Sequence, residues 1–299
     1  MKRLIVIVGP TAVGKTATAI EIARQLDTEI LSCDSRQFYK ELNIGVARPT
    51  PEELTAAKHH FIACRSVSNP YNVFDYEQDA LALLNQLFKS KDNVIAVGGS
   101  GLYVDALCQG INVMPDPPAE LRAELSGKIA DGRLSELLED LERLDPAYYA
   151  AVDRKNPIRI QRALEVIRTS GRPYSELTSK ELPQRPFKIV KIALDCDRDE
   201  LKCRIYNRVD KMMEQGLEAE ARSLLPFRNL NTLNTVGYKE LFGHFDGTKT
   251  KEEAVTEIKN HTWQYAKKQL TWLKRYNDIH WVSAKNISGI MQVLESIEY

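Results

Sequence analysis

The sequence is poor in cysteine, and its cysteines are scattered along the chain. There are five, Cys33, Cys64, Cys108, Cys196 and Cys203, and they form no C-x-x-C pair. This argues against a zinc-binding module and against a disulfide framework. Unpaired cysteines are typical of a reducing compartment, so we expect a cytoplasmic protein.

An excess of charge of either sign is also missing. Over 299 residues, 41 Lys and Arg residues balance 41 Asp and Glu residues. Overall charge therefore gives the chain no indiscriminate attraction to nucleic acid. Charge is nevertheless segregated locally, because positions 154–172 hold six basic residues and one acidic residue, Glu165.

Long apolar runs, internal repeats and low-complexity segments are lacking as well. The sequence shows no run long enough to span a membrane, and its start has the pattern of a buried strand without a signal-peptide cleavage site. A hydrophobic fraction of 43% and a charged fraction of 27% are ordinary for a globular protein. We expect no membrane partner and one large or two modest domains.

What the sequence does contain is a phosphate-binding loop near its start. The apolar run 4–8 leads into a G-x-x-x-x-G-K-[ST] motif made of Gly9, Pro10, Thr11, Ala12, Val13, Gly14, Lys15 and Thr16. Positions 17–26 have helical spacing, so the loop lies between a strand and a helix, as this motif requires. The backbone N–H groups and Lys15 suit a di- or triphosphate, and the Thr16 hydroxyl suits Mg²⁺.

A polar segment, Asp34, Ser35, Arg36 and Gln37, follows the short strand expected at 29–33. Ligands of parallel sheets bind beyond the carboxyl ends of the strands, so Asp34 is expected to face the phosphate site in a catalytic or metal-binding role. The alternative is an ordinary turn or helix-capping aspartate.

The strand expected at 94–97 ends in Gly98, Gly99 and Ser100. An ordinary P-loop ATPase has an aspartate at such a strand end, where it helps to hold Mg²⁺. The glycines allow a ligand to approach the backbone closely, although a tight turn would explain them too.

The pattern changes between residues 115 and 186, where helical segments at 120–130, 134–144, 146–152 and 157–169 replace the strands. This predicts an α/β fold with a P-loop NTPase-like parallel sheet flanked by helices, formed by residues 1–114 and 187–299. Residues 115–186 would form a mostly helical insertion domain. In its last helix Arg159 and Arg162 lie off the apolar face, which suits either solvent or RNA.

Two later helices combine basic and apolar residues. The helix expected at 198–215 carries Arg204 and Arg208 beside its apolar stripe. The helix expected at 262–275 interleaves aromatic residues with Lys267 and Lys268. Such interleaving suits RNA, but a buried aromatic stripe beside a solvated lysine face explains it equally well.

Taken in order, these motifs resemble the tRNA dimethylallyltransferase family, also called isopentenyl-tRNA transferases, in its bacterial form. The resemblance covers nearly the whole chain. Its motifs are the loop 9–16, Asp34 to Tyr39, Val97 to Tyr103, Arg162 to Val166, Arg204 to Asp210, Gly216-Leu217, Gly237 to Glu240 and Tyr265 to Trp272. Ser100 stands where the family usually has Thr, and Arg48 stands where Lys is common.

The resemblance implies transfer of a dimethylallyl group from dimethylallyl diphosphate to the exocyclic amine of the adenine 3′-adjacent to the anticodon, with release of diphosphate. The loop 9–16 would hold the leaving diphosphate. Asp34 would take the proton of the amine, while Thr16, Mg²⁺ and Arg204 or Arg208 would neutralise the leaving group.

By the same resemblance the partners are the tRNA anticodon stem-loop and dimethylallyl diphosphate, and we expect a monomer. tRNA contacts are implied at Asp34, Ser35, Arg36, Gln37, Ser100, Arg122, Ile158, Arg159, Ile160, Gln161, Arg162 and Gly237. The basic positions Lys267 and Lys268 join them. Two other functions remain open, an ATP-dependent kinase of a nucleotide or small metabolite and an RNA-binding protein switched by a nucleotide.

Overall fold

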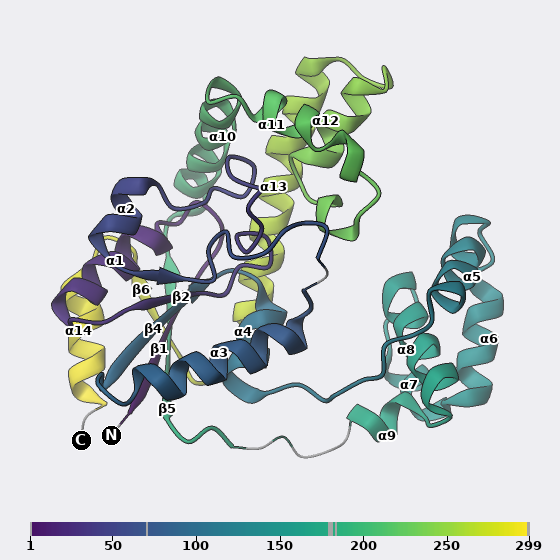
Figure 1. Ribbon diagram of the computed structural model, residues 1–299, viewed down its shortest axis with the longest axis horizontal. Helices are drawn as coiled ribbons and strands as arrows, with labels where there is room; N and C mark the ends of the chain where they lie inside the picture. The colour runs from purple at the N-terminus through teal and green to yellow at the C-terminus, as the bar shows by residue number, and fades with distance from the viewer. Residues whose placement is uncertain (1, 70, 179–181, 183, 298–299) are drawn as a thin grey trace. The chain divides into compact units, whose positions relative to one another are not determined.

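The computed structural model describes residues 2–69, 71–178, 182 and 184–297. The strands in these residues form one parallel sheet with the order β3-β2-β4-β1-β5-β6 (Figure 1). They are β1 (Arg3–Val8), β2 (Ile30–Ser32), β3 (His59–His60), β4 (Asn93–Gly98), β5 (Lys188–Asp195) and β6 (Ile279–Ser283). The predicted α/β fold with a parallel sheet is confirmed. The sequence does not predict β3, because two residues are too short to show a period.

The central strand β1 is buried on both faces. Leu4, Val6 and Val8 belong to one apolar core, and Ile5 and Ile7 belong to the other. A parallel strand covered on both faces has a continuous apolar run instead of an alternating pattern, which explains why the sequence marks it so clearly.

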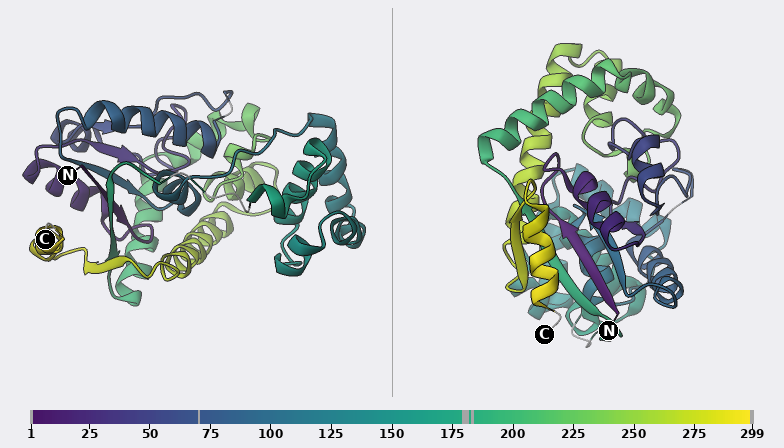
Figure 2. Two further views of the ribbon diagram at one scale, coloured as in Figure 1. Left: turned by 90° about the horizontal axis from the view of Figure 1, so that it is seen from below. Right: turned by 90° about the vertical axis from the view of Figure 1, so that its left-hand side faces the viewer.

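Helices cover both faces of the sheet. Those of the core unit are α1 (Lys15–Gln25), α2 (Pro51–Ala56), α3 (Val73–Leu87), α4 (Gly101–Gln109), α10 (Arg198–Glu214), α11 (Leu217–Ser223), α12 (Tyr238–Phe245), α13 (Lys251–Leu273) and α14 (Ile287–Ser296). Two 3-10 turns at Leu225–Phe227 and Asn231–Leu233 join α11 to α12. Helices α1 and α14 pack together on the face of Ile5 and Ile7, whereas α3 and α4 pack on the other face (Figures 1 and 2).

Helix α13 is longer than the sequence predicts. It starts at Lys251 because Thr250 and Glu253 form a reciprocal capping box, with the Thr250 hydroxyl accepting the Glu253 N–H. The predicted segment 262–275 covers only its C-terminal half. None of the helices in the part of the chain that the structure describes is long and apolar enough to cross a membrane.

The chain divides into two compact units, residues 1–108 with 185–299 and residues 109–184. The second unit holds α5 (Ala119–Ala130), α6 (Leu134–Leu144), α7 (Pro146–Ala151), α8 (Pro157–Ser170) and α9 (Tyr174–Thr178). It has an apolar core of its own, which includes Leu125, Leu137, Leu141 and Leu164. We call it the insertion unit.

The register of the sheet brings three strand ends to one edge. Val8 of β1 lies opposite Gly98 of β4, and Ser32 of β2 lies opposite Val97. The phosphate loop, the segment beginning at Asp34 and the turn at Ser100 therefore leave the sheet side by side. Helices α10 to α13 gather beyond this edge (Figure 2).

Candidate active site

The phosphate loop has the backbone that its glycines predict. Gly9 has φ 155° and Gly14, the N-cap of α1, has φ 111°, values that side chains rarely adopt. The Lys15 ammonium donates to the carbonyls of Gly9 (3.1 Å) and Pro10 (2.8 Å). Burial and the neighbouring charge of Arg208 lower the pKa of Lys15 to about 8, against the opposing effect of Asp34. Two half-buried cations beside the backbone of the loop favour a polyanion at this place.

Helix α13 fastens the phosphate loop to the end of β4. The Gln269 side chain accepts the Thr11 N–H at 2.8 Å and donates to the Gly99 carbonyl at 2.9 Å. A Cβ on Gly99 would collide with this amide, and a Cβ on Gly98 would lie 2.6 Å from the Cys33 carbonyl oxygen. The space beside these glycines is thus filled by the protein itself. Our expectation of a ligand there is wrong, because the close approach is between segments of the chain.

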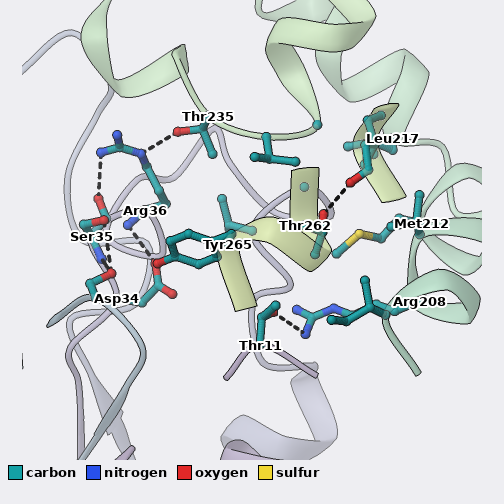
Figure 3. A pocket seen from close by; sticks show the side chains of 18 of the residues that line it. Thr11, Asp34, Ser35, Arg36, Arg208, Met212, Leu217, Thr235, Thr262 and Tyr265 are labelled. Atoms are coloured by element: carbon teal, nitrogen blue, oxygen red, sulfur yellow. Dashed lines mark hydrogen bonds between the residues drawn. The ribbon is translucent and has the colours of Figure 1, made fainter. Parts of the chain in front are cut away.

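Asp34 closes a turn and also faces a cavity. Its Oδ1 accepts the backbone N–H of Arg36 at 2.9 Å and that of Gln37 at 3.4 Å. The carboxylate lies on the cavity wall beside the Tyr265 side chain (Figure 3). Burial and the charge of Asp34 raise the pKa of Tyr265 to about 12. The turn interpretation of Asp34 is confirmed, and its functional role stays a prediction that this turn allows.

The residues next to Asp34 hold the neighbouring segments in place. The Ser35 N–H donates to Ser100 Oγ at 3.1 Å. Arg36 Nε donates to Thr235 Oγ1 at 2.6 Å. The Gln37 amide donates to the Ala47 carbonyl at 3.1 Å, so this side chain ties down the loop that follows. Ser35, Arg36 and Ser100 line the cavity, and their contact with tRNA stays a prediction.

The cavity has a volume of about 290 Å³ and lies entirely in the core unit. Asp34 and its neighbours form one side of it, and the apolar side chains of Met212 and Leu217 lie on another (Figure 3). Val209 also lines the cavity. Thr11 lies between them, next to Arg208. A polar and an apolar end suit a molecule that is reactive at one end and apolar at the other.

The structure separates the two candidate arginines. Arg208 lines the cavity, and its guanidinium donates to Thr11 Oγ1 at 3.4 Å. Arg204 instead donates to the Val13 carbonyl at 3.1 Å and pairs with Glu200 at 2.6 Å. Arg208 thus faces the cavity, whereas Arg204 does not line it and instead hydrogen-bonds the backbone of the phosphate loop.

Gly237 reaches the cavity through its backbone. It has φ 104° and its N–H donates to Glu240 Oε2 at 2.7 Å. The other oxygen of this buried carboxylate lies 2.7 Å from His261 Nδ1 on α13. The motif at 237–240 therefore builds one wall of the site. The sequence shows the motif but gives no sign of this pairing.

The insertion unit gathers several predicted tRNA contacts around one buried acid. Glu165, which is 4% exposed, lies 3.6 Å from Arg122 Nε and 3.5 Å from an Arg162 guanidinium nitrogen. The Gln161 amide donates to it at 2.9 Å. Together these bonds fix two guanidinium groups at the surface of α8 and α5.

Two neighbours in α8 differ sharply in exposure. Ile158 is 76% exposed, whereas Ile160 is fully buried in the core of the insertion unit. A tRNA contact is implied at Ile160, but its side chain is turned into this core, because the helical period turns every third or fourth residue inward. Arg159 is exposed, as a phosphate contact requires.

Two basic residues of α13 are exposed, whereas its aromatic residue Trp272 packs against α4. Lys267 and Lys268 are exposed, and the Lys267 ammonium lies 5.9 Å from the centre of the Trp263 ring. Trp272 packs where a Cβ on Gly101 would meet its ring at 2.5 Å, and its Nε1 donates to Asp105. The packed Trp272 and the exposed lysines fit the aromatic stripe beside a solvated lysine face, whereas contact of Lys267 and Lys268 with RNA stays a prediction.

The described residues offer few protein ligands to a metal ion, since they contain no group of three or more His, Cys, Asp and Glu side chains placed for one. Thr16 lies in the first turn of α1, directly after Lys15. Mg²⁺ commonly binds through one or two protein oxygens, substrate phosphates and water. The oxygen donors present fit an ion held in that way.

Comparison with known proteins settles the family. The family described as IPP transferase matches residues 37–276. The chain belongs to the IPP transferase family. It is 44% identical over 296 residues to tRNA dimethylallyltransferase 1 of Phocaeicola vulgatus, and this match covers 99% of each chain. It is 46% identical over 291 residues to tRNA dimethylallyltransferase 2 of Porphyromonas gingivalis, which covers 97% of both.

Solved structures agree with this IPP transferase assignment. The tRNA isopentenylpyrophosphate transferase of Bacillus halodurans has a TM-score of 0.74 at 34% identity, over 99% of this chain and 96% of that one. A eukaryotic dimethylallyltransferase acting on tRNA has a TM-score of 0.78 over 96% of this chain and 75% of that one, and at 23% identity it supports the fold alone. The predicted family is confirmed. The kinase and the nucleotide-switched RNA-binding protein gain no support.

Proposed function

We propose that this IPP transferase carries out dimethylallyl transfer to tRNA in the cavity beyond β1, β2 and β4. The observation that carries the proposal is that Asp34, Thr11 and Arg208 line one cavity. A proton acceptor and donors for a leaving diphosphate thus face the same small space. This arrangement suits attack by an amine on an allylic diphosphate.

In the proposed step the exocyclic amine of adenine attacks C1 of the allylic donor. The C1–N bond forms as the C1–O bond breaks, and the electron pair of that bond leaves with the diphosphate. The amine is a poor nucleophile because its lone pair is delocalised into the ring. Asp34 takes its proton as the bond forms. The turn that Oδ1 closes with Arg36 and Gln37 orients the carboxylate for this role.

The leaving diphosphate gains negative charge during the step, and the loop can absorb it. Lys15, the loop amides, the Thr11 hydroxyl and Arg208 are the donors on that side. Thr16 would hold Mg²⁺ together with the diphosphate oxygens, and a bound Mg²⁺ supplies further neutralisation of the leaving group. Arg204 acts through the loop by holding the Val13 carbonyl.

The remaining walls suit the two organic groups. The target base must leave its stack to reach the cavity, as in other base-modifying enzymes. Tyr265 beside Asp34 offers a ring face for that base. Val209, Met212 and Leu217 offer apolar surface to the dimethylallyl group.

The tRNA anticodon stem-loop is the proposed macromolecular partner. The proposed phosphate contacts are exposed Arg159 and half-buried Arg162 of the insertion unit and exposed Lys267 and Lys268 of α13. We propose that the protein acts as a monomer in the cytoplasm, where its tRNA substrate would be found.

The test is incubation with tRNA and labelled dimethylallyl diphosphate, followed by isolation of the tRNA. We expect label on the adenine that follows the anticodon, and no transfer to a tRNA carrying guanine there. A parallel incubation with labelled ATP and nucleotide acceptors tests the kinase. Phosphorylated acceptor without prenylated tRNA would contradict the proposal.

A further inference from the structure

A second cavity lies behind the first one and shares a wall with it. It has a volume of about 930 Å³ and is lined by the loop around Ile44 and Pro49, by Ile62 and by α10. Among the described residues, Arg208 and Met212 line both cavities. They lie one helical turn apart on α10, so they project from the same face of this helix.

The loop formed by residues 44–47 also separates the two cavities. We call this loop, together with the side chains of Arg208 and Met212, the partition. Gly45 and Val46 face the first cavity, whereas Ile44 and Ala47 face the second. The Glu220 carboxylate accepts the N–H groups of Ile44 (2.8 Å) and Gly45 (3.0 Å), which holds this part of the partition in place. The side chains of Arg208 and Met212 on α10 form the remaining part of the partition.

The two shared side chains differ in what they can do. Arg208 has a task at the diphosphate, since it contacts Thr11. Met212 has no charge or strong hydrogen-bonding group, and it belongs to the apolar end of the first cavity with Val209 and Leu217. An unbranched thioether fills irregular apolar space well. Its place therefore suits the far end of an apolar substrate group.

We propose that Met212 sets the length of the prenyl chain that the enzyme accepts. A cavity of about 290 Å³ must receive both the base and the allylic group, so it has little room beyond five carbons. With Met212 in place the chain ends against the partition. Without its side chain the cavity opens into the second one, where Ile44, Pro49 and Ile62 offer apolar surface to a further isoprene unit. This inference rests on the proposed position of the donor.

The experiment compares five-carbon and ten-carbon allylic diphosphates, dimethylallyl and geranyl diphosphate, as donors to tRNA. The reaction is the same for both, with C1–N formed, C1–O broken and the proton taken by Asp34. We expect Met212→Ala to raise the ratio of kcat/KM for the ten-carbon donor to that for the five-carbon donor by about tenfold or more, the usual range for a changed apolar pocket. Met212→Leu, which conserves volume, should keep the wild-type ratio.

The matched control is Met213→Ala. Met213 is the next residue on α10 and, like Met212, packs against the main core, but it lines neither cavity. It loses the same atoms without opening the partition, so its ratio should stay at the wild-type value. Met212→Val should give an intermediate ratio.

The outcomes separate this inference from the proposed function. If wild-type protein fails to prenylate tRNA, the proposed function is at fault. If Met212→Ala transfers the five-carbon group normally but discriminates against ten carbons as the wild type does, the chain-length proposal is wrong. It is also wrong if both Met212→Ala and Met212→Val lose five-carbon transfer while they still bind the donor, because Met212 would then serve the reaction itself.

Discussion

Gln269 accepts the Thr11 N–H at 2.8 Å and donates to the Gly99 carbonyl at 2.9 Å. One buried side chain amide thus joins the segments that follow β1 and β4. This bond occupies the Thr11 N–H. We therefore expect Gln269 to be a positioning residue that keeps the Thr11 hydroxyl beside Arg208 at the cavity.

Gln269→Glu keeps an acceptor for Thr11 but loses the donor to Gly99. An unmade hydrogen bond of a buried group costs about 1–3 kcal/mol of stability, so we expect the loop at Thr11 to shift. A misplacement of this kind near the reacting groups should lower kcat by up to about 100-fold. Donor affinity should change much less, because the other loop donors remain. Gln264→Glu, at an exposed position of the same helix, is the control. Equal kcat for both variants would refute the positioning role.

Lys15 makes donor binding depend on pH. Because burial and Arg208 lower its pKa to about 8, the ammonium is charged below that pH and neutral above it. We expect the dissociation constant of dimethylallyl diphosphate to rise above pH 8, by up to tenfold per pH unit. Bound diphosphate favours the charged form, so binding near pH 9 should take up a proton. Calorimetry in buffers of different ionisation enthalpy measures that uptake.

Lys15→Arg provides the control for the pH effect. An arginine stays charged throughout this range, although its fork does not reproduce the contacts of an ammonium. Its affinity should be lower at neutral pH but flat between pH 7.5 and roughly 9.5. A wild-type affinity that is equally flat would show that Lys15 does not titrate there.

Substitution of Arg204 and of Arg208 should affect different steps of the reaction. Arg208→Ala removes a donor that faces the leaving group, and such a loss typically costs about 10²- to 10³-fold in kcat. Arg204→Ala removes a bond to the Val13 carbonyl behind the loop, so we expect weaker donor binding and a lower Tm with a smaller change in kcat. Single-turnover rates at saturating donor separate the two effects. Similar rate losses would mean that the loop and the leaving group cannot be assigned to different arginines.

Binding of tRNA should depend on the surface of α8. We expect Arg159→Glu with Arg162→Glu to raise the dissociation constant of tRNA and to reduce its salt dependence by roughly one unit of slope per lost phosphate contact. Donor binding should hardly change. Arg143→Glu, on α6 and paired with Asp140, is a control in the same unit. Parallel salt dependences for wild type and the double variant would leave α8 without a role in tRNA binding.

Local signals predict the parts of the site that a short stretch of chain defines. The loop 9–16 and Asp34 are visible because each directly follows a buried strand. The sequence could not choose between Arg204 and Arg208, since they lie one turn apart on the same helix. Their different partners, Val13 and Thr11, appear only in the fold.

The sequence alone could not predict contacts between segments that are far apart along the chain, because only the fold brings them together. Gln269 lies within a recognised motif, but its bonds to Thr11 and Gly99 span more than half of the chain. In the sequence Met212 is one more apolar residue of the helix at 198–215, and its place between two cavities depends on the loop around Ile44.

The central claim is that Asp34 is the base in dimethylallyl transfer, and Asp34→Asn tests it most directly. Asparagine keeps Oδ1 as acceptor for the Arg36 N–H, so the turn survives while the proton acceptor is lost. The measurement is the single-turnover rate of label transfer from dimethylallyl diphosphate to tRNA, with donor affinity measured in parallel. We predict a rate lower by about 10²- to 10⁴-fold with unchanged donor affinity. Transfer by Asp34→Asn at the wild-type rate would contradict the account.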